Sequence, residues 1–137
     1  MSPLRSRDIA MLIKEKFGSK FQITLEEPFP FDTTSYRPDV VVRSSDGKAI
    51  KAIIEIEQCS RKHVVGGVIT ADYCVRKDRQ HKLFGHQKPR MFVLSLKNKN
   101  TENYKERLPM LKRYTKFKGI VIGNKEEIFD ALAEIQP

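Results

Sequence analysis

Two consecutive apolar segments separated by a turn constrain the fold of this chain more than any other feature. Residues 40–42 are three valines, and residues 52–56 are apolar at four of five positions. Between them lies the turn-prone sequence Ser-Ser-Asp-Gly at 44–47, and Pro38 precedes the first segment. β-Branched runs bounded by such residues are typical of strands joined as a hairpin. We therefore expect these segments to be neighbouring strands of one sheet.

Three carboxylates border the expected hairpin. Asp39 directly precedes the first strand, and Glu55 and Glu57 lie at the end of the second. Side chains two apart on a strand point to the same side, with Cα atoms roughly 6.5 to 7 Å apart, so Glu55 and Glu57 should share a face. A buried carboxylate is costly unless a positive charge compensates it, and oxygen ligands suit Mg²⁺. If Asp39 converges on that face, the three acids predict a site for a hard cation.

A Pro-Asp pair, a hairpin return and an acid-x-acid triplet at the end of an apolar strand resemble the catalytic motif of the restriction-endonuclease-like nucleases, usually written PD…(D/E)xK. In that family the two acids hold Mg²⁺, and the lysine orients or activates the attacking water. The resemblance implies that Asp39 and Glu55 bind Mg²⁺ or Mn²⁺. Glu57 stands at the lysine position, as glutamate or glutamine does in several restriction enzymes of the superfamily. It would be a further metal ligand or would orient the water.

The resemblance adds candidate residues on both sides of the motif. Members of the superfamily often take an extra metal ligand from a glutamate of the first helix. Glu15 is the candidate here, with Glu26 and Glu27 at the end of the first strand as alternatives. The helix after the motif strand begins beside the metal in this family. Lys62 or His63 would then contact the scissile phosphate or replace the missing lysine, unless both are first-turn residues that point to water.

The hydrophobic pattern of the whole chain predicts an α/β domain with the element order αβββαβαβα. The resemblance implies a restriction-endonuclease-like core, αβββαβ, over roughly residues 6–97, with a mixed sheet flanked by helices and an added βα unit at the C-terminus. The paired glycines Gly66 and Gly67 weaken a helix and indicate close approach to the sheet, to a partner subunit or to substrate backbone, of which packing on the sheet is favoured. The expected helices are 6–17, 60–75, 102–116 and 126–135, and the expected strands are 21–26, 40–42, 52–56, 91–96 and 119–122.

A length of 137 residues fits a single domain, 1–137, able to bury a sizeable core. No apolar run approaches the roughly 20 residues needed to cross a bilayer. The first residues lack the apolar stretch of a secretory signal, so we expect a cytoplasmic protein. The two cysteines, Cys59 and Cys74, have no metal-ligand spacing and should be reduced and structural.

The basic charge is concentrated in one part of the chain. The formal net charge is +9, and residues 76–118 hold fourteen Lys or Arg against three acids. A polyanion is the natural partner of such a band, whereas the alternative is a solubilising face. Asp72, just before it, is interpreted as a solvated or capping acid. The residues that we expect to contact DNA phosphates are Arg76, Lys77, Arg79, Lys82, Lys112 and Arg113.

These features together predict a metal-dependent endonuclease that hydrolyses DNA phosphodiesters. A homodimer would be needed for paired cuts on two strands. The alternative from a different class is a non-catalytic nucleic-acid-binding or assembly subunit that keeps the fold after losing the lysine. A third interpretation is an RNA-binding domain whose acids are structural. The chain has neither a glycine-rich nucleotide-binding motif nor a serine-hydrolase elbow.

Overall fold

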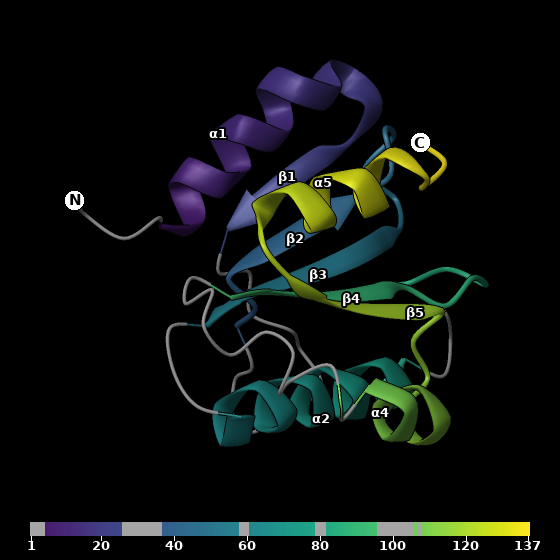
Figure 1. Ribbon diagram of the computed structural model, residues 1–137. Helices are drawn as coiled ribbons and strands as arrows, with labels where there is room; N and C mark the ends of the chain where they lie inside the picture. Colours follow the sequence, from purple (N-terminus) through teal and green to yellow (C-terminus); the bar gives the residue numbers. More distant parts are fainter. Residues whose placement is uncertain (1–4, 26–36, 58–60, 79–81, 96–105, 107) are drawn as a thin grey trace.

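The chain folds as an α/β structure in which helices flank an open sheet (Figure 1). This architecture confirms the coarse fold class predicted from the hydrophobic pattern. The computed structural model describes residues 5–25, 37–57, 61–78, 82–95, 106 and 108–137, with the backbone alone at 61–65.

The sheet has five strands in the order β1-β2-β3-β4-β5. β1 (Gln22–Leu25), β2 (Val40–Arg43) and β3 (Ile50–Glu57) are antiparallel neighbours. β4 (Arg90–Ser95) and β5 (Gly119–Gly123) continue the sheet as parallel strands. The sheet is therefore mixed, and the carboxyl ends of β3, β4 and β5 lie at one edge of it.

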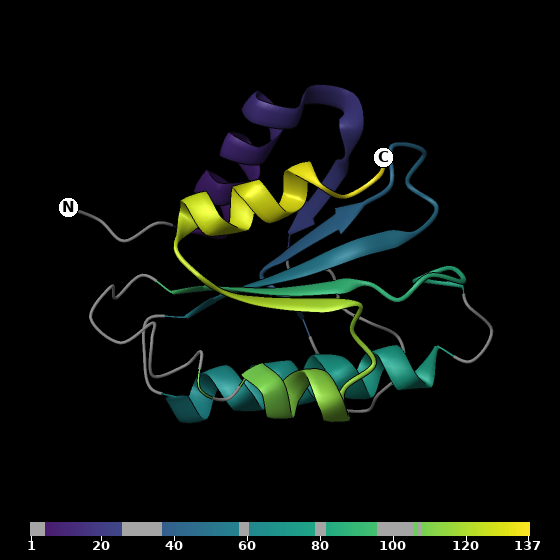
Figure 2. The ribbon, with the colours of Figure 1, turned by 45° about the vertical axis from the view of Figure 1, so that its right-hand side comes forward.

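Helices cover both faces of this sheet (Figure 2). α1 (Ser6–Phe17), followed by the short 3-10 turn η1 (Gly18–Lys20), lies with α5 (Lys125–Ala133) on one face. α2 (Arg61–Lys77) and α4 (Leu108–Tyr114) lie on the other face. Each face has its own apolar core, because alternate side chains of a strand point to opposite sides.

The strand β3 shows how the two cores divide the sheet. Ile54 packs beneath α1 and α5 together with Val40 and Val42 of β2. Ile53 packs beneath α2 together with Val41. All five side chains are fully buried, which is why residues 40–42 and 52–54 read as nearly continuous apolar runs rather than alternating ones.

The turn between β2 and β3 forms where the Ser-Ser-Asp-Gly sequence predicted it. The backbone N–H of Gly47 donates to the carbonyl of Ser44 over 2.9 Å, and the Ser44 hydroxyl donates to Asp46 Oδ1 over 2.6 Å. Gly47 has a φ of +76°, and a Cβ there would lie 2.6 Å from Gln22 Oε1. Glycine is favoured here by the positive φ, whereas the end of the flexible Gln22 side chain could move to make room for a Cβ.

The predicted elements are observed in the predicted order, with differences at their ends. The helix over residues 6–17 has the predicted bounds and stops at Gly18, whose φ is +57°. The helix predicted at 102–116 is observed from Leu108 to Tyr114. Residues 102–105 and 107 of that prediction lie outside the described residues. Pro109 is tolerated in this helix because the N–H groups of a first turn have no intrahelical partner.

Among the described residues no helix is both long enough and apolar enough to cross a membrane. Cys74 belongs to α2 and is buried in the core between this helix and the sheet, as expected for a structural cysteine. Cys59 lies outside the described residues.

Candidate active site

The three acids of the predicted motif lie at one edge of the sheet and belong to the face that α2 covers. Val41 pairs with Ile53 across β2 and β3, and both side chains pack beneath α2. Glu55 and Glu57 follow Ile53 at two-residue steps on β3, and Asp39 precedes Val41 by two residues. Because strand side chains alternate, all three acids are placed on the α2 side. The shared face predicted for Glu55 and Glu57 follows from this register.

Asp39 reaches across to β3 at the level of the two glutamates. The backbone N–H of Ile56 donates to Asp39 Oδ2 over 2.8 Å. Val40 pairs with Ile54, so continuing the same register by one residue sets Asp39 opposite Glu55. Such directly opposed residues have Cα atoms roughly 4.5 to 5.5 Å apart. Asp39 is half-buried and Glu55 is 9% exposed, so water has limited access to this pair.

Glu57 faces the backbone of α2. A Cβ built on Gly67 would lie 3.9 Å from Glu57 Oε1, whereas one on Gly66 would meet no atom within 4 Å. Gly67 therefore lies on the side of α2 that faces Glu57, and as a glycine it places no side chain between the helix and this acid. The close approach predicted from the paired glycines is not observed at Gly66, and at Gly67 the 3.9 Å distance is an ordinary contact that would leave room for a Cβ.

Ser95 is a neighbour of the acids that sequence reasoning missed. It ends β4, pairs in register with Glu57 and is 5% exposed. Met91 and Val93 of the same strand pack beneath α2, so alternation puts Ser95 on that face too. A serine after an apolar strand carries no signal of its own. Its relation to the acids follows from the parallel pairing of β3 with β4.

The donors at this edge can be tested against the predicted cation. The described residues contain no group of three acids, histidines or cysteines arranged to hold a metal ion. What the register brings together is the pair Asp39 and Glu55. Mg²⁺ is usually bound by one or two carboxylates and keeps several waters, so a pair of this kind fits Mg²⁺ when substrate phosphate and water complete its coordination.

The other acids proposed for the metal are not brought to this edge. Glu15 is exposed on α1, which packs on the opposite face of the sheet from α2. The described structure therefore separates Glu15 from Asp39, Glu55 and Glu57. Glu26 and Glu27 lie outside the described residues.

Arg76 and Asp72 join α2 to α4 and to the chain that follows it. Arg76 Nε donates to Asp72 Oδ2 over 2.7 Å, and Arg76 Nη2 donates to the carbonyl of Tyr114 over 2.6 Å. The backbone N–H of Lys116 donates to Asp72 Oδ1 over 2.6 Å. Asp72 is 6% exposed, so its interpretation as a solvated or capping acid was wrong. Burial of this carboxylate is tolerated because each of its oxygens accepts a hydrogen bond, one from Arg76 Nε and one from the Lys116 N–H.

The remaining basic candidates are spread over the outer layer. The ammonium group of Lys77 lies 5.1 Å from the ring centre of Tyr73, and the guanidinium of Arg113 lies 5.6 Å from that of Tyr114. Lys82 and Lys112 are exposed. Lys77 is ten residues after Gly67, roughly 15 Å along the helix axis. Lys62 and His63 fall in the part of α2 described by backbone alone, and Arg79 lies outside the described residues.

Comparison of the sequence with models of protein families and with curated proteins finds no match. The activity of the chain must therefore be inferred from its own residues. The two features of the described residues that bear on activity are the acids at the β2–β3 edge and the basic groups of the α2–α4 layer.

Proposed function

We propose that this protein is a metal-dependent endonuclease that hydrolyses DNA phosphodiester bonds with Mg²⁺ or Mn²⁺. The observation that carries the proposal is the hydrogen bond from the Ile56 N–H to Asp39, which holds this carboxylate at the end of β3 beside Glu55. Two acids from adjacent strands, at the end of the sheet face that α2 covers, form a donor set suited to a hard cation.

The fold supports the proposal at the level of element order. The elements α1, β1, β2, β3, α2 and β4 occur in the order αβββαβ, which is the order that the resemblance to restriction-endonuclease-like nucleases implies. The pair β5 and α5 then extends the sheet beyond that core. A fold of this kind is compatible with many activities, so the acids and not the fold are the main support.

Asp39 and Glu55 would hold the metal ion in this proposal. A bound metal lowers the pKa of coordinated water and stabilises the charge that develops on a phosphate under attack. An ionised glutamate has acceptor oxygens and no donor, so Glu57 would orient the attacking water by accepting its proton or would be a further ligand. Gly67 leaves the space above Glu57 free of a side chain.

The basic groups of the outer layer would contact the DNA backbone. Exposed Lys77, Lys82, Lys112 and Arg113 are available to phosphates, and each neutralised phosphate adds to the salt dependence of binding. Arg76 differs from them because Asp72 and the Tyr114 carbonyl already occupy its guanidinium. We assign it a structural role within the α2–α4 layer.

A non-catalytic nucleic-acid-binding subunit is the second candidate. Glu57 stands where the motif has lysine, and the described side chains form no three-ligand group. Both observations favour a protein that keeps the fold and binds nucleic acid without cutting it. The two candidates differ in one measurable property, which is metal-dependent cleavage.

The test is a nuclease assay on supercoiled, branched and single-stranded DNA with Mg²⁺, Mn²⁺ or EDTA. We expect cleavage with either metal and none with EDTA. Asp39→Asn and Glu55→Gln should abolish it, while Asp130→Asn, which removes one exposed carboxylate from α5, should not. If the wild-type protein neither cuts any substrate nor shows a metal-induced rise in melting temperature, the enzyme proposal is wrong and the binding subunit is favoured.

A further inference from the structure

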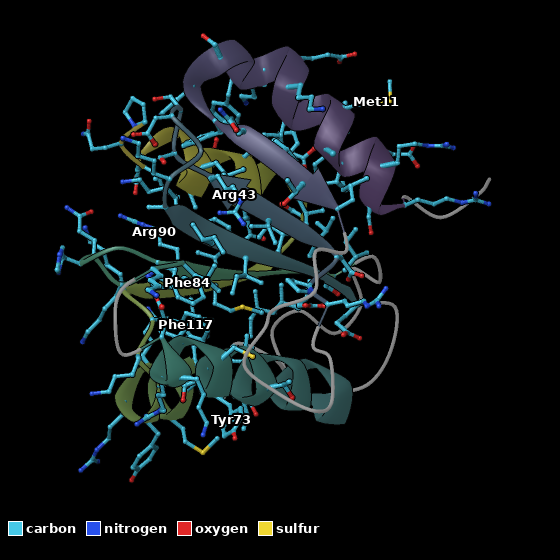
Figure 3. All side chains as sticks on the ribbon, turned by 180° about the vertical axis from the view of Figure 1, so that it is seen from behind. Met11, Arg43, Tyr73, Phe84, Arg90 and Phe117 are labelled. Atoms are coloured by element: carbon cyan, nitrogen blue, oxygen red, sulfur yellow. The ribbon has the colours of Figure 1, made fainter. Side chains whose placement is uncertain are left out.

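A second charged site lies at the edge of the sheet opposite the acids. β3, β4 and β5 all begin there, and a cavity of about 190 Å³ opens between them and the end of α5. Four cationic side chains from three separate segments of the chain line it. Figure 3 shows Arg90 and Phe84, both lining residues, at the same end of the molecule. The cationic residues are Lys51, Lys88, Arg90 and Lys118.

The positive charge of this cavity is not balanced within the described structure. Glu134 is the one acid among the described residues that line the cavity. No carboxylate of a described residue forms an ion pair with Lys51, Lys88, Arg90 or Lys118. Like charges gathered around one space repel each other, so an anion between them would be stabilised by all four.

Hydrogen bonds hold the wall of the cavity in place. The carboxylate of Asp78, 6% exposed, accepts the backbone N–H groups of Lys82, Leu83 and Phe84 at 3.0, 3.1 and 2.9 Å. The backbone N–H of Ile50 donates to the Leu83 carbonyl over 2.7 Å. These bonds attach the segment after α2 to the start of β3, so the wall is formed before any ligand arrives.

A further backbone contact sets two of the cations side by side. The N–H of Lys118 donates to the carbonyl of Pro89 over 2.9 Å, which places Lys118 next to the segment that carries Lys88 and Arg90. Both lysine side chains are exposed, whereas Arg90 and Lys51 are half-buried. The cavity thus offers two exposed ammonium groups together with a half-buried ammonium group and a half-buried guanidinium.

We propose that this cavity binds a phosphate group. A guanidinium matches the planar spacing of phosphate oxygens, and lysines add point charges. The buried ring of Phe84 and the side chain of Ile50 give part of the lining an apolar surface suited to a sugar or base attached to the phosphate. The phosphate can come from a free mononucleotide or from a nucleic-acid strand.

This site is distinct from the acidic edge. Lys51 and Glu57 lie six residues apart on β3, which corresponds to roughly 20 Å along an extended strand. Glu55, with Asp39 opposite it, is four residues from Lys51, roughly 13 Å along the strand, so a phosphate held at Lys51 would not contact these two acids. The proposal does not depend on cleavage, because binding of phosphate requires neither the acids nor a metal.

The experiment measures binding in EDTA, where nuclease activity is excluded. Inorganic phosphate and deoxyadenosine monophosphate are titrated by calorimetry, and a short fluorescent duplex by anisotropy. The test variant Lys88→Gln/Lys118→Gln removes two exposed charges that line the cavity, and Arg90→Gln is a second, single variant. The control Arg7→Gln/Lys14→Gln removes two exposed charges from α1, and circular dichroism checks that every variant is folded.

We expect the Lys88/Lys118 variant to bind at least one ligand class about tenfold more weakly, since charge-assisted hydrogen bonds are lost. Arg90→Gln should weaken binding of the same ligand class. Loss of affinity for inorganic phosphate and the mononucleotide identifies a mononucleotide site. Loss of affinity for the duplex alone identifies a strand-binding site. Equal binding by the test and control variants, or no binding of either ligand class by the wild-type protein, would overturn the proposal.

Discussion

The carboxylate of Asp39 accepts a 2.8 Å hydrogen bond from the backbone N–H of Ile56, so the acid that precedes β2 is held against the end of β3. This bond gives Asp39 a structural role in addition to the proposed metal-binding role. It occupies one carboxylate oxygen and leaves the other available. Substitutions of Asp39 can separate the two roles because asparagine keeps an acceptor oxygen and alanine does not.

Asp39→Asn should abolish cleavage while leaving the free energy of unfolding close to that of the wild type. Without metal its melting temperature should rise, because one of the clustered like charges is gone. Asp39→Ala should also be inactive and should be less stable by about 1 to 3 kcal/mol, since the half-buried Ile56 N–H loses its acceptor. Urea unfolding and plasmid cleavage measure the two effects. If Asp39→Asn cleaves DNA at the wild-type rate, Asp39 is not an active-site residue.

Glu57 is the position at which the chain departs from the nuclease motif. Glu57→Lys, which restores the motif, should keep measurable cleavage with lower affinity for Mg²⁺, because it exchanges an acceptor for a donor beside Glu55. Glu57→Ala should lose most activity. The control is Gln58→Ala, which we expect to change the rate little. Cleavage rates over a Mg²⁺ titration give both quantities, and an active Glu57→Ala with an inactive Gln58→Ala would move the third catalytic position by one residue.

Asp72 should matter for stability and little for chemistry. Asp72→Ala removes the acceptor of Arg76 Nε and of the Lys116 N–H, so the free energy of unfolding should fall by about 1 to 3 kcal/mol. Glu126→Ala is a matched control, since Glu126 forms an exposed ion pair with Lys125 at 4.0 Å, of a kind worth about 1 kcal/mol or less. Chemical denaturation compares the two. Equal losses would mean that the α2–α4 link does not stabilise the fold.

Lys112 and Arg113 are the exposed basic pair of α4, and they carry the clearest prediction for DNA binding. Lys112→Glu/Arg113→Glu should weaken binding to duplex DNA and reduce the slope of affinity against salt concentration by about one unit per lost phosphate contact. The same reversal at Arg7 and Lys14 on α1 serves as control. Anisotropy titrations at several salt concentrations measure the slopes. An unchanged slope in the α4 variant would mean that Lys112 and Arg113 do not contact DNA phosphates and contribute only to solubility.

The ionisation of Asp46 makes the stability of the β2–β3 turn depend on pH. The Ser44 hydroxyl and then the Lys48 backbone N–H, which bond the ionised carboxylate, lower the pKa of Asp46 below its ordinary value of 3.8. Its contribution to stability is therefore present above pH 3.8 and is lost as pH falls through the lowered pKa. Asp46→Asn should remove this part of the acid sensitivity. Urea midpoints above and below that pH test it, and identical pH profiles for variant and wild type would contradict it.

The elements were predicted well where local spacing and a stop signal agreed. The helix at residues 6–17 has both, because its apolar residues recur at helical spacing and Gly18 adopts a positive φ. The helix predicted at 102–116 has no comparable sequence signal that marks its first residue, and the described part begins at Leu108. Periodicity identifies the type of an element more reliably than its ends.

The functional residues were predicted to different degrees for a similar reason. The common face of Glu55 and Glu57 follows from the two-residue period of a strand, which needs no partner. The burial of Asp72 and the place of Ser95 beside Glu57 could not be predicted in this way. Each depends on which elements pack together, and neither residue type nor spacing encodes that choice.

The sequence by itself determined the order and type of the elements, the β2–β3 turn and the shared face of the two glutamates. These are local properties set by side-chain period, β-branching and glycine conformation. The tertiary structure alone decided that α1 carries Glu15 to the face opposite the acids. It also brought Lys51, Lys88, Arg90 and Lys118 around one cavity. Such groupings depend on long-range packing of strands and helices, because burial and charge proximity are properties of the assembled layers and not of any one segment.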